Sequence, residues 1–412
     1  MPVEKQRGCV YCGAVPASHM FLYVDTILSL ISDVFESIFY GSRSNIFSPY
    51  ISRIENVSMH LMALLIISLG LGKFVRQHET DHLDRTQVMM DEARARGIRM
   101  EILQVFGRNT SQARAWLPHK SGGREGWFYF DFFPIPFRKK SMCGVNIDNK
   151  KHFKTLLRTK GVRVPQGRSV FSLREAIRVM KEIGKPVIVK PMIGSRSRHT
   201  RINIRDANEL ADAFAKAKQL CPFVMVEEYI EGNIYRVTCV GGVVEGVLEL
   251  VRPTIVADGV STVKELLNRT NANPDFDSLT PIKDDTLLDL SLIHQGLTRE
   301  SVPEKGKKIL LTEFSERVNG GYFVDREIPD SVRRYLERGA RAVCIPLVGF
   351  DVISKNIQNE DEPITFLEGN TAPFIEVHHI PYAGVARNIA EKVWDLWLQK
   401  NNNDSYTDKE SK

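Results

Sequence analysis

The spacing of hydrophobic residues predicts helices and some strand in the first third of the chain. Residues 21–40 repeat apolar side chains at three- to four-residue intervals with acidic residues between them, which is typical of an amphipathic helix. Residues 84–96 have the pattern of a surface helix, and a strand is expected over residues 98–106. The aromatic run at 127–137 predicts a strand that ends at prolines. We therefore expect an N-terminal domain, α/β or mostly helical and of unknown role, over residues 1–141.

The pattern changes from about residue 142, where helical stretches alternate with β-rich runs. These runs lie at residues 187–191, 224–230, 235–251 and 364–370. Runs of this kind predict an α+β fold with sizeable antiparallel sheets. We assign residues 142–400 to this second domain, and the polar residues 401–412 to a disordered tail.

The most apolar run, at residues 61–72, is shorter than the roughly 20 residues that cross a bilayer. Charged residues flank it on both sides, so a buried helix is the expected structure and a membrane-associated helix is the alternative. Residues 1–8 are polar and charged, so no signal peptide is expected and the protein is assigned to the cytoplasm.

Composition and charge narrow the class of protein. Hydrophobic residues make up 43% of the chain and charged residues 26%, which excludes a fully disordered or fibrous protein. The net charge of +6 suits anionic small molecules and is too weak to indicate nucleic acid. The six cysteines are mostly isolated and are expected to be reduced thiols. Cys9 and Cys12 form one Cys-x-x-Cys pair with His19 nearby, which leaves a metal or redox role open although a second pair is missing.

Candidate phosphate-binding cations lie at the ends of two predicted elements. Lys150 opens a predicted helix, and Lys190 ends a β-branched strand beside a polar turn. A lysine at such a strand end can direct its charge at a phosphate. The turn at residues 194–200 has small residues whose backbone N–H groups can converge on an anion, and Arg196 and Arg198 add charge.

Candidate metal ligands lie closer to the C-terminus. Asp351 follows an apolar strand pattern, and Glu368 and Asn370 are two residues apart in a strand, so their side chains share one face. Carboxylate and amide oxygens suit a Mg²⁺ ion that bridges phosphates. A solvated strand edge is the alternative for Asp351 taken alone, but the three residues together with the upstream lysines favour a functional site.

About eight sequence blocks, in order, resemble the ATP-grasp superfamily of carboxylate–amine ligases. They are NKKHFKTLLRTKGVRVP, GKPVIVKPMIGS, VMVEEYIEGNIYRV, IVADGVSTVKELL, GLTRESVPEKGKKILL, NGGYFVD, GFDV and LEGNTAPFIEVHH. The similarity covers about residues 146–382 and is greatest to the ATP-grasp modules of cyanophycin synthetases and bifunctional glutathione synthetases. It implies two α+β subdomains that clamp ATP, one of them a lid at about residues 163–233.

The resemblance also implies a role for each matching residue. The implied ATP-binding residues are Lys150, Lys154, Lys190, Gly194, Ser195, Arg196, Ser197, Arg198, Glu227, Glu228, Tyr229 and Ile230. The implied ligands for Mg²⁺, or for Mn²⁺, are Asp351, Glu368 and Asn370. Arg236 and Arg252 are candidates to steady the carboxylate or the oxyanion, and His378 or a carboxylate is the candidate general base.

The activity implied by the resemblance is an ATP-dependent ligase. It would convert the carboxylate of an amino acid or peptide into an acyl phosphate, which an amine then attacks. Neither a nucleic acid nor a membrane is an expected partner, and the expected assembly is a homodimer or homotetramer.

Departures from the family pattern keep a second interpretation open. Ser197 and His199 stand where the family loop has glycine, and Ile234 stands where it has an acidic residue. We expect such a loop to contact phosphate through side chains, including His199, more than through backbone N–H groups. The alternative function is a nucleotide-binding regulatory protein with weak or no turnover. No Mur-ligase-like module follows residue 382, so synthesis of cyanophycin by this chain alone is not expected.

Overall fold

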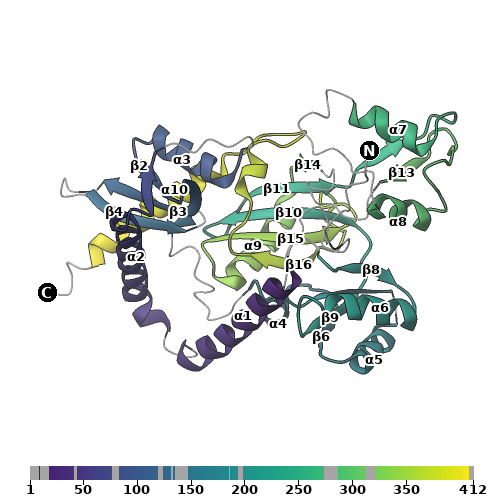
Figure 1. Ribbon diagram of the computed structural model, residues 1–412, viewed down its shortest axis with the longest axis horizontal. Coiled ribbons are helices and arrows are strands. Elements are labelled where there is room, and N and C mark those ends of the chain that lie inside the picture. Colours follow the sequence, from purple (N-terminus) through teal and green to yellow (C-terminus); the bar gives the residue numbers. More distant parts are fainter. Residues whose placement is uncertain are drawn as a thin grey trace.

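The computed structural model describes residues 9, 18–40, 44–76, 83–118, 124–130, 133–134, 147–184, 186–193, 198–272, 286–311 and 322–407. These residues form four antiparallel sheets, which Figure 1 shows as separate units along the long axis of the molecule. Each sheet has its own cluster of buried hydrophobic side chains. The α+β class predicted from the β-rich runs is confirmed.

The first sheet brings the two ends of the chain together. Its strands, in spatial order, are β1 (Gly72–Val75), β2 (Arg99–Val105), β3 (Arg108–Pro118), β4 (Arg124–Phe130) and β5 (Phe133–Pro134). α3 (Arg85–Ala95) and the C-terminal helix α10 (Ile389–Thr407) pack together beside it (Figure 1) and fully bury Met89 and Trp394. The predicted helix and strand in this region are confirmed. Their core, however, also needs residues beyond 388, and α10 continues past residue 401, where we expected the tail to begin.

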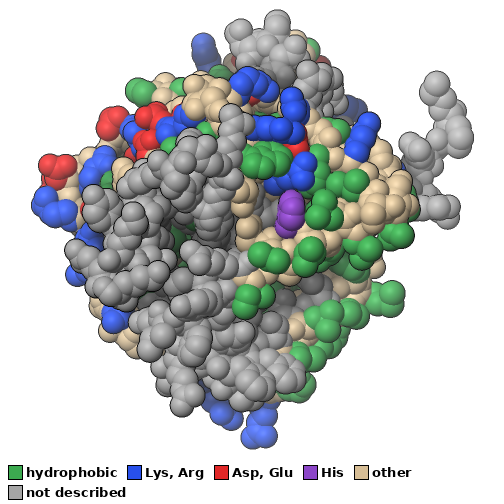
Figure 2. Space-filling model, turned by 90° about the vertical axis from the view of Figure 1, so that its left-hand side faces the viewer, with side chains coloured by type: hydrophobic (Ala, Val, Ile, Leu, Met, Phe, Trp, Pro, Cys, Tyr) green, Lys and Arg blue, Asp and Glu red, His purple; other side chains and the backbone are tan. Residues whose placement is uncertain are grey.

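Two long helices, α1 (His19–Tyr40) and α2 (Ser44–Ser68), precede this sheet. The helix predicted at residues 21–40 is confirmed, but the prediction of a buried helix at residues 61–72 is wrong. α2 ends at Ser68, and the side chains of Leu61, Leu65 and Leu69 are 58–62% exposed. Only one side of α2, around Ala63, packs on the first sheet. Figure 2 shows hydrophobic side chains exposed on this end of the molecule. Within the described ranges, no helix combines the length and hydropathy needed to cross a membrane.

The central sheet has five strands and one face covered by helices. Its strands, in order, are β14 (Tyr322–Asp325), β11 (Val243–Val251), β10 (Asn233–Val240), β15 (Leu347–Ser354) and β16 (Thr365–Asn370). Side chains from α4 (Lys150–Thr159) and α9 (Asp330–Val343) share its hydrophobic core. The β-rich run 235–251 is a hairpin, which turns at Gly241 and Gly242 with φ of 62° and 87°, a conformation that glycine adopts without strain.

A smaller unit, which we name the lid module, contains four strands and two helices. The strand order is β6 (Gly167–Val170), β9 (Val224–Glu228), β7 (Val187–Pro191) and β8 (Arg201–Ile204). α5 (Leu173–Ile183) and α6 (Ala207–Ala217) pack on this sheet. The lid module lies within the range 163–233 that the sequence predicts for a lid, and Figure 1 shows it beside the central sheet, next to β16 and α4.

The fourth sheet belongs to a small unit that the sequence pattern did not predict. It pairs β12 (Thr254–Val256) with β13 (Lys308–Leu310) and packs α7 (Val263–Asn271) and α8 (Thr286–His294) around a core of its own. Among the described cysteines, Cys9, Cys221 and Cys239 are free, as expected. The expectation of a reduced thiol is wrong for Cys344, which is disulfide-bonded.

Candidate active site

Strand register brings two predicted metal ligands opposite each other. β15 and β16 are antiparallel neighbours in which Asp351 pairs with Glu368, and Gly349 pairs with Asn370. Because alternate residues of a strand share a face, Glu368 and Asn370 lie on the same side as Asp351. The sequence placed these three residues together by resemblance, and the register supplies the geometry.

A glycine between two of these ligands lets helix α4 approach the sheet closely. A Cβ atom on Gly369 would lie 2.8 Å from the ring of Phe153, which is in α4. This close approach brings Lys150, at the first turn of α4, to 3.4 Å from Glu368. Asn149 caps the helix, since its side chain accepts hydrogen bonds from the backbone N–H groups of Lys151 and His152.

The two carboxyl groups form a coupled acidic pair. Arg236 of β10 donates two hydrogen bonds to Asp351, with Nε to Oδ1 at 2.5 Å and Nη2 to Oδ2 at 3.2 Å. Burial and the neighbouring Glu368 nevertheless raise the pKa of Asp351 to about 6. Burial opposes ionisation of Glu368 too, but Lys150 and Lys190 lower its pKa to about 2. A site in which one of two adjacent carboxyl groups resists ionisation is suited to an added cation.

Glu227, in the lid module, contacts helix α4, which packs on the central sheet. Its carboxylate accepts one bond from Lys154 of α4 and another from Lys190 of β7, with Nζ of Lys190 at 3.0 Å from Oε2. All three side chains are largely buried, at 12% exposure or less. We expected Glu227 at the adenine pocket; the structure adds the role of counter-ion to two lysines that the sequence assigned to phosphate.

The two lysines respond differently to the shared carboxylate. Burial lowers the pKa of Lys154 to about 7. Glu227 offsets this effect only in part, and the positive charge of Lys190 lowers the pKa of Lys154 further. Burial also disfavours the charge of Lys190, but Glu227 and Glu368 together raise its pKa. The two lysines and Glu227 adjoin the acidic pair, so four cationic groups and three carboxyl groups form one network. Such a network attracts a polyphosphate, which would restore the full charge of Lys154.

The segment after β9 connects the lid module to the central sheet. The Glu228 carboxylate accepts a hydrogen bond from Gln166 N at 3.0 Å, and Tyr229 N donates to Pro186 O at 2.8 Å. Tyr229 and Ile230 are partly buried. Their expected contact with adenine stays a prediction, as do the phosphate contacts of Gly194, Ser195, Arg196 and Ser197, which lie outside the described residues, and of Arg198.

His378 is fully buried and is a poor general base. It lies in a 3₁₀ helix (Ile375–His378), with Nε2 2.8 Å from Oγ1 of Thr238. Burial, with the nearby Arg236, lowers the pKa of His378 to about 3. Such an imidazole stays neutral at pH 7 and binds a proton weakly, so the structure favours a positioning role and disfavours the base role given by the sequence.

Arg252 is not brought to the acidic pair by any described contact. It follows β11 and is partly exposed, so Arg236 is the better of the two candidate arginines. Thr238 was missed by the sequence because a buried threonine in a strand gives no separate signal; only its pairing with His378 across 140 residues makes it notable.

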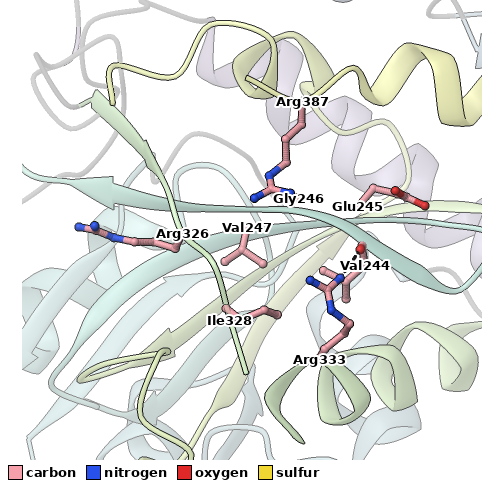
Figure 3. Close-up of a pocket in the computed structure, with 8 residues that line it drawn as sticks. All are labelled: Val244, Glu245, Gly246, Val247, Arg326, Ile328, Arg333 and Arg387. Carbon is pink, nitrogen blue, oxygen red and sulfur yellow. Dashed lines mark hydrogen bonds between the residues drawn. The ribbon is translucent and has the colours of Figure 1, made fainter. Parts of the chain in front are cut away.

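A small pocket lies along the first half of β11 (Figure 3). Its lining residues are Val244, Glu245, Gly246, Val247, Arg326, Ile328, Arg333 and Arg387. Figure 3 shows Arg387 extending toward Gly246, against which His378 also lies, since a Cβ there would meet its Nδ1 at 2.5 Å. Arg326 pairs with Glu249 and Arg387 with Asp325, so these charges are already balanced.

Known proteins are similar to this chain over the segments that form the site. Residues 149–237 match the family described as carbamoyl-phosphate synthase L chain, ATP binding domain. Cyanophycin synthetase from Geminocystis herdmanii is 28% identical over 339 residues, which is 77% of this chain and 36% of that protein. The glutathione biosynthesis bifunctional protein GshAB from Clostridium perfringens is 25% identical over 389 residues, 90% of this chain and 46% of that protein.

The fold also matches a solved structure. A bifunctional glutathione synthetase from Pasteurella multocida aligns with a TM-score of 0.50 at 24% identity, over 76% of this chain and 43% of that one. This chain thus spans from about a third to a half of the length of these proteins. The matches confirm the fold predicted from the sequence blocks.

Proposed function

We propose that this chain, whose fold is that of the ATP-grasp superfamily, is an ATP-dependent ligase that joins a carboxylate to an amine. The observation that supports this most directly is the single buried network that links Lys154 and Lys190 through Glu227, next to the pair Asp351–Glu368. The similar proteins are named for glutathione and cyanophycin synthesis, which supports an amino acid or peptide as the acid.

The acidic pair is chemically suited to Mg²⁺. Asp351, Glu368 and Asn370 offer hard oxygen ligands on one face. Burial and the neighbouring Glu368 raise the pKa of Asp351, and a bound cation would offset both effects. Mn²⁺ accepts the same ligands. A bound ion would neutralise negative charge on the phosphate oxygens of ATP.

The protein's own groups would hold and orient the reactants. Lys150 and Lys190 would bind phosphate oxygens and stabilise the charge of the transferred group. Arg236, which is bonded to Asp351, would orient the carboxylate or bind the oxyanion of the tetrahedral intermediate. The lid module, joined to this site by Glu227, would exclude water from the acyl phosphate.

The proposed reaction has two steps, transfer of the γ-phosphoryl group to the carboxylate and attack of the amine on the acyl phosphate. A carboxylate oxygen attacks the γ-phosphorus, and ADP leaves. The amine attacks the acyl carbon, the carbon–oxygen bond to phosphate breaks, and inorganic phosphate departs while the amine loses a proton. His378, whose pKa is about 3, is a weak acceptor for that proton.

Phosphate release with a panel of amino acids and short peptides tests this proposal. Release should depend on ATP, on a divalent ion and on a particular acid–amine pair. Asp351→Ala and Glu368→Ala should each lower kcat by at least about 100-fold, as expected when one electrostatic partner of the transition state is removed. Glu360→Gln, which changes an exposed acid outside the site, is the matched control and should retain wild-type rates.

Two results would reject the ligase. Near-normal turnover in both alanine variants would show that the acidic pair does not act in the reaction. Tight ATP binding without release that depends on an acid would support the regulatory alternative instead. A cytoplasmic location and a homo-oligomeric assembly remain predictions from the sequence.

A further inference from the structure

Cys9, His19 and His199 meet where the N-terminal segment contacts the lid module. Sγ of Cys9 lies 3.5 Å from Nε2 of His199, across 190 residues of sequence. The rings of His19 and His199 meet edge to face, with centroids 4.8 Å apart. One potential ligand atom from each of the three lies within 4.8 Å of the others. We name these residues the Cys–His cluster.

The imidazole of His199 is fixed in one orientation and one tautomer. Its Nδ1 lies 2.7 Å from the carbonyl oxygen of Lys216. A carbonyl can only accept, so Nδ1 carries the proton and the lone pair of Nε2 points toward Cys9. Histidines that bind metals typically donate their other N–H to a backbone carbonyl in this way. His199 is 1% exposed, and burial lowers its pKa, so the ring is in the neutral form that ligates.

The backbone of His199 is also held in a costly conformation. Its φ is 53°, in the left-handed region that a residue with a Cβ rarely adopts. Such strain persists only where the surroundings enforce it, and it is common at ligand sites. The expectation that this imidazole contacts phosphate is therefore not met, since the ring is buried and engaged with Lys216, Cys9 and His19.

Helix α1 already packs on the lid module beside the cluster. Thr26 Oγ1 donates to Leu220 O at 3.3 Å. Leu30 packs against the buried group of Met192, Cys221 and Met225. The cluster therefore lies at the end of an existing contact rather than on an isolated surface.

We propose that Cys9, His19 and His199 bind one Zn²⁺ ion, which fastens the N-terminal segment to the lid module. Zinc bonds of about 2.3 Å to sulfur and about 2.0–2.1 Å to nitrogen, at tetrahedral angles, place S and N about 3.5 Å apart. The observed separation of 3.5 Å matches this value. Thiolate and imidazole are the ligands that zinc prefers among protein groups. Three protein ligands leave a fourth position for water or another donor. Cys12 lies outside the described residues.

Metal titration of the full chain tests the site without ATP, so its result is independent of the ligase proposal. After chelation and dialysis, the protein should retain one equivalent of added Zn²⁺ by elemental analysis. Co²⁺ in its place should give a thiolate-to-cobalt charge-transfer band. Cys9→Ser should abolish that band, and His19→Ala should weaken Zn²⁺ binding at least about 100-fold, because even loss of an outer-shell partner costs 10–100-fold.

Matched controls separate ligation from folding. Cys221→Ala removes a buried thiol from the same contact, and His60→Ala removes an exposed histidine from α2; both should bind Zn²⁺ like the wild type. Cys9 and His19 are only partly buried, so their variants should keep the wild-type circular dichroism. Absence of stoichiometric Zn²⁺ from the wild type would overturn the proposal and leave a thiol–imidazole hydrogen bond. An unchanged cobalt band in Cys9→Ser would overturn it as well.

Discussion

Glu227 shows at the residue scale how one buried carboxylate sets the charge of two lysines. With Lys154 and Lys190 both bonded to it, the pKa of Glu227 falls to about 2 although burial opposes ionisation. The pKa of Lys154 is lowered and that of Lys190 is raised because the two lysines share the Glu227 carboxylate. One negative charge cannot fully compensate two buried cations. The network is therefore one negative charge short until a phosphate arrives.

Removal of that carboxylate should be costly for the fold. Glu227→Gln leaves two buried lysines without their anion, and the free energy of unfolding at pH 7 should fall by about 3 kcal/mol. Urea unfolding measures this change. Glu182→Gln breaks the ion pair with Arg168 in the same module, but both side chains are about half exposed, so it should cost less than about 1 kcal/mol.

The same variant has a defined pH signature. The folded pKa of Glu227, about 2, lies below its ordinary value of 4.5, so its stabilisation is complete above about pH 4.5 and is lost as the pH falls toward 2. The difference between wild type and Glu227→Gln should therefore shrink by about 3 kcal/mol over that window. A difference that stays constant with pH would show that the carboxylate is not the ionised partner of the lysines.

At the scale of elements, Gly369 sets the distance between α4 and the central sheet. Gly369→Ala would place a methyl group 2.8 Å from Phe153 and 3.1 Å from Ile147. α4 must then shift and carry Lys150 and Lys154 with it. We expect a loss of about 1–3 kcal/mol in stability, and a higher KM for ATP in steady-state kinetics.

A second glycine supplies the control for this prediction. A Cβ on Gly126, in an exposed strand position, has its nearest neighbour at 3.7 Å, so Gly126→Ala should be tolerated. If Gly369→Ala left the KM for ATP unchanged, the lysines of α4 would not contact the nucleotide.

The sequence could predict elements whose signals are local. The β-branched run at β7, the apolar pattern before Asp351 and the i, i+2 spacing of Glu368 and Asn370 all act within a few residues, and the structure has these strands. Strand register, by contrast, pairs Asp351 with Glu368 through hydrogen bonds between separate segments. The bond from Lys154 to Glu227 spans 73 residues, and no periodicity encodes such a contact.

Apolar runs were less reliable for the same reason. Residues 61–72 are hydrophobic enough for burial, yet only one stripe of α2 meets the sheet. Whether a helix is buried depends on which other elements cover it, and this is not a local property.

At the scale of the whole molecule, both chain ends reinforce distant parts of the fold. α10 returns to α3, where Trp394 Nε1 donates to Met89 O at 3.1 Å, so the first core is closed by the last helix. α1 leaves this region and reaches the lid module at Leu220. Figure 1 shows α1 crossing between the two parts.

The central claim is that ATP activates a carboxylate as an acyl phosphate. The most direct measurement uses a pool of amino acids and peptides whose carboxyl oxygens are labelled with oxygen-18, together with ATP, Mg²⁺ and the full chain. An acyl phosphate leaves one carboxylate oxygen on the phosphate when the amine attacks carbon, so mass spectrometry should find one oxygen-18 atom in the released phosphate. Glu368→Ala should abolish this transfer. Phosphate that is released at wild-type rates without the label, its new oxygen coming from water, would contradict the account.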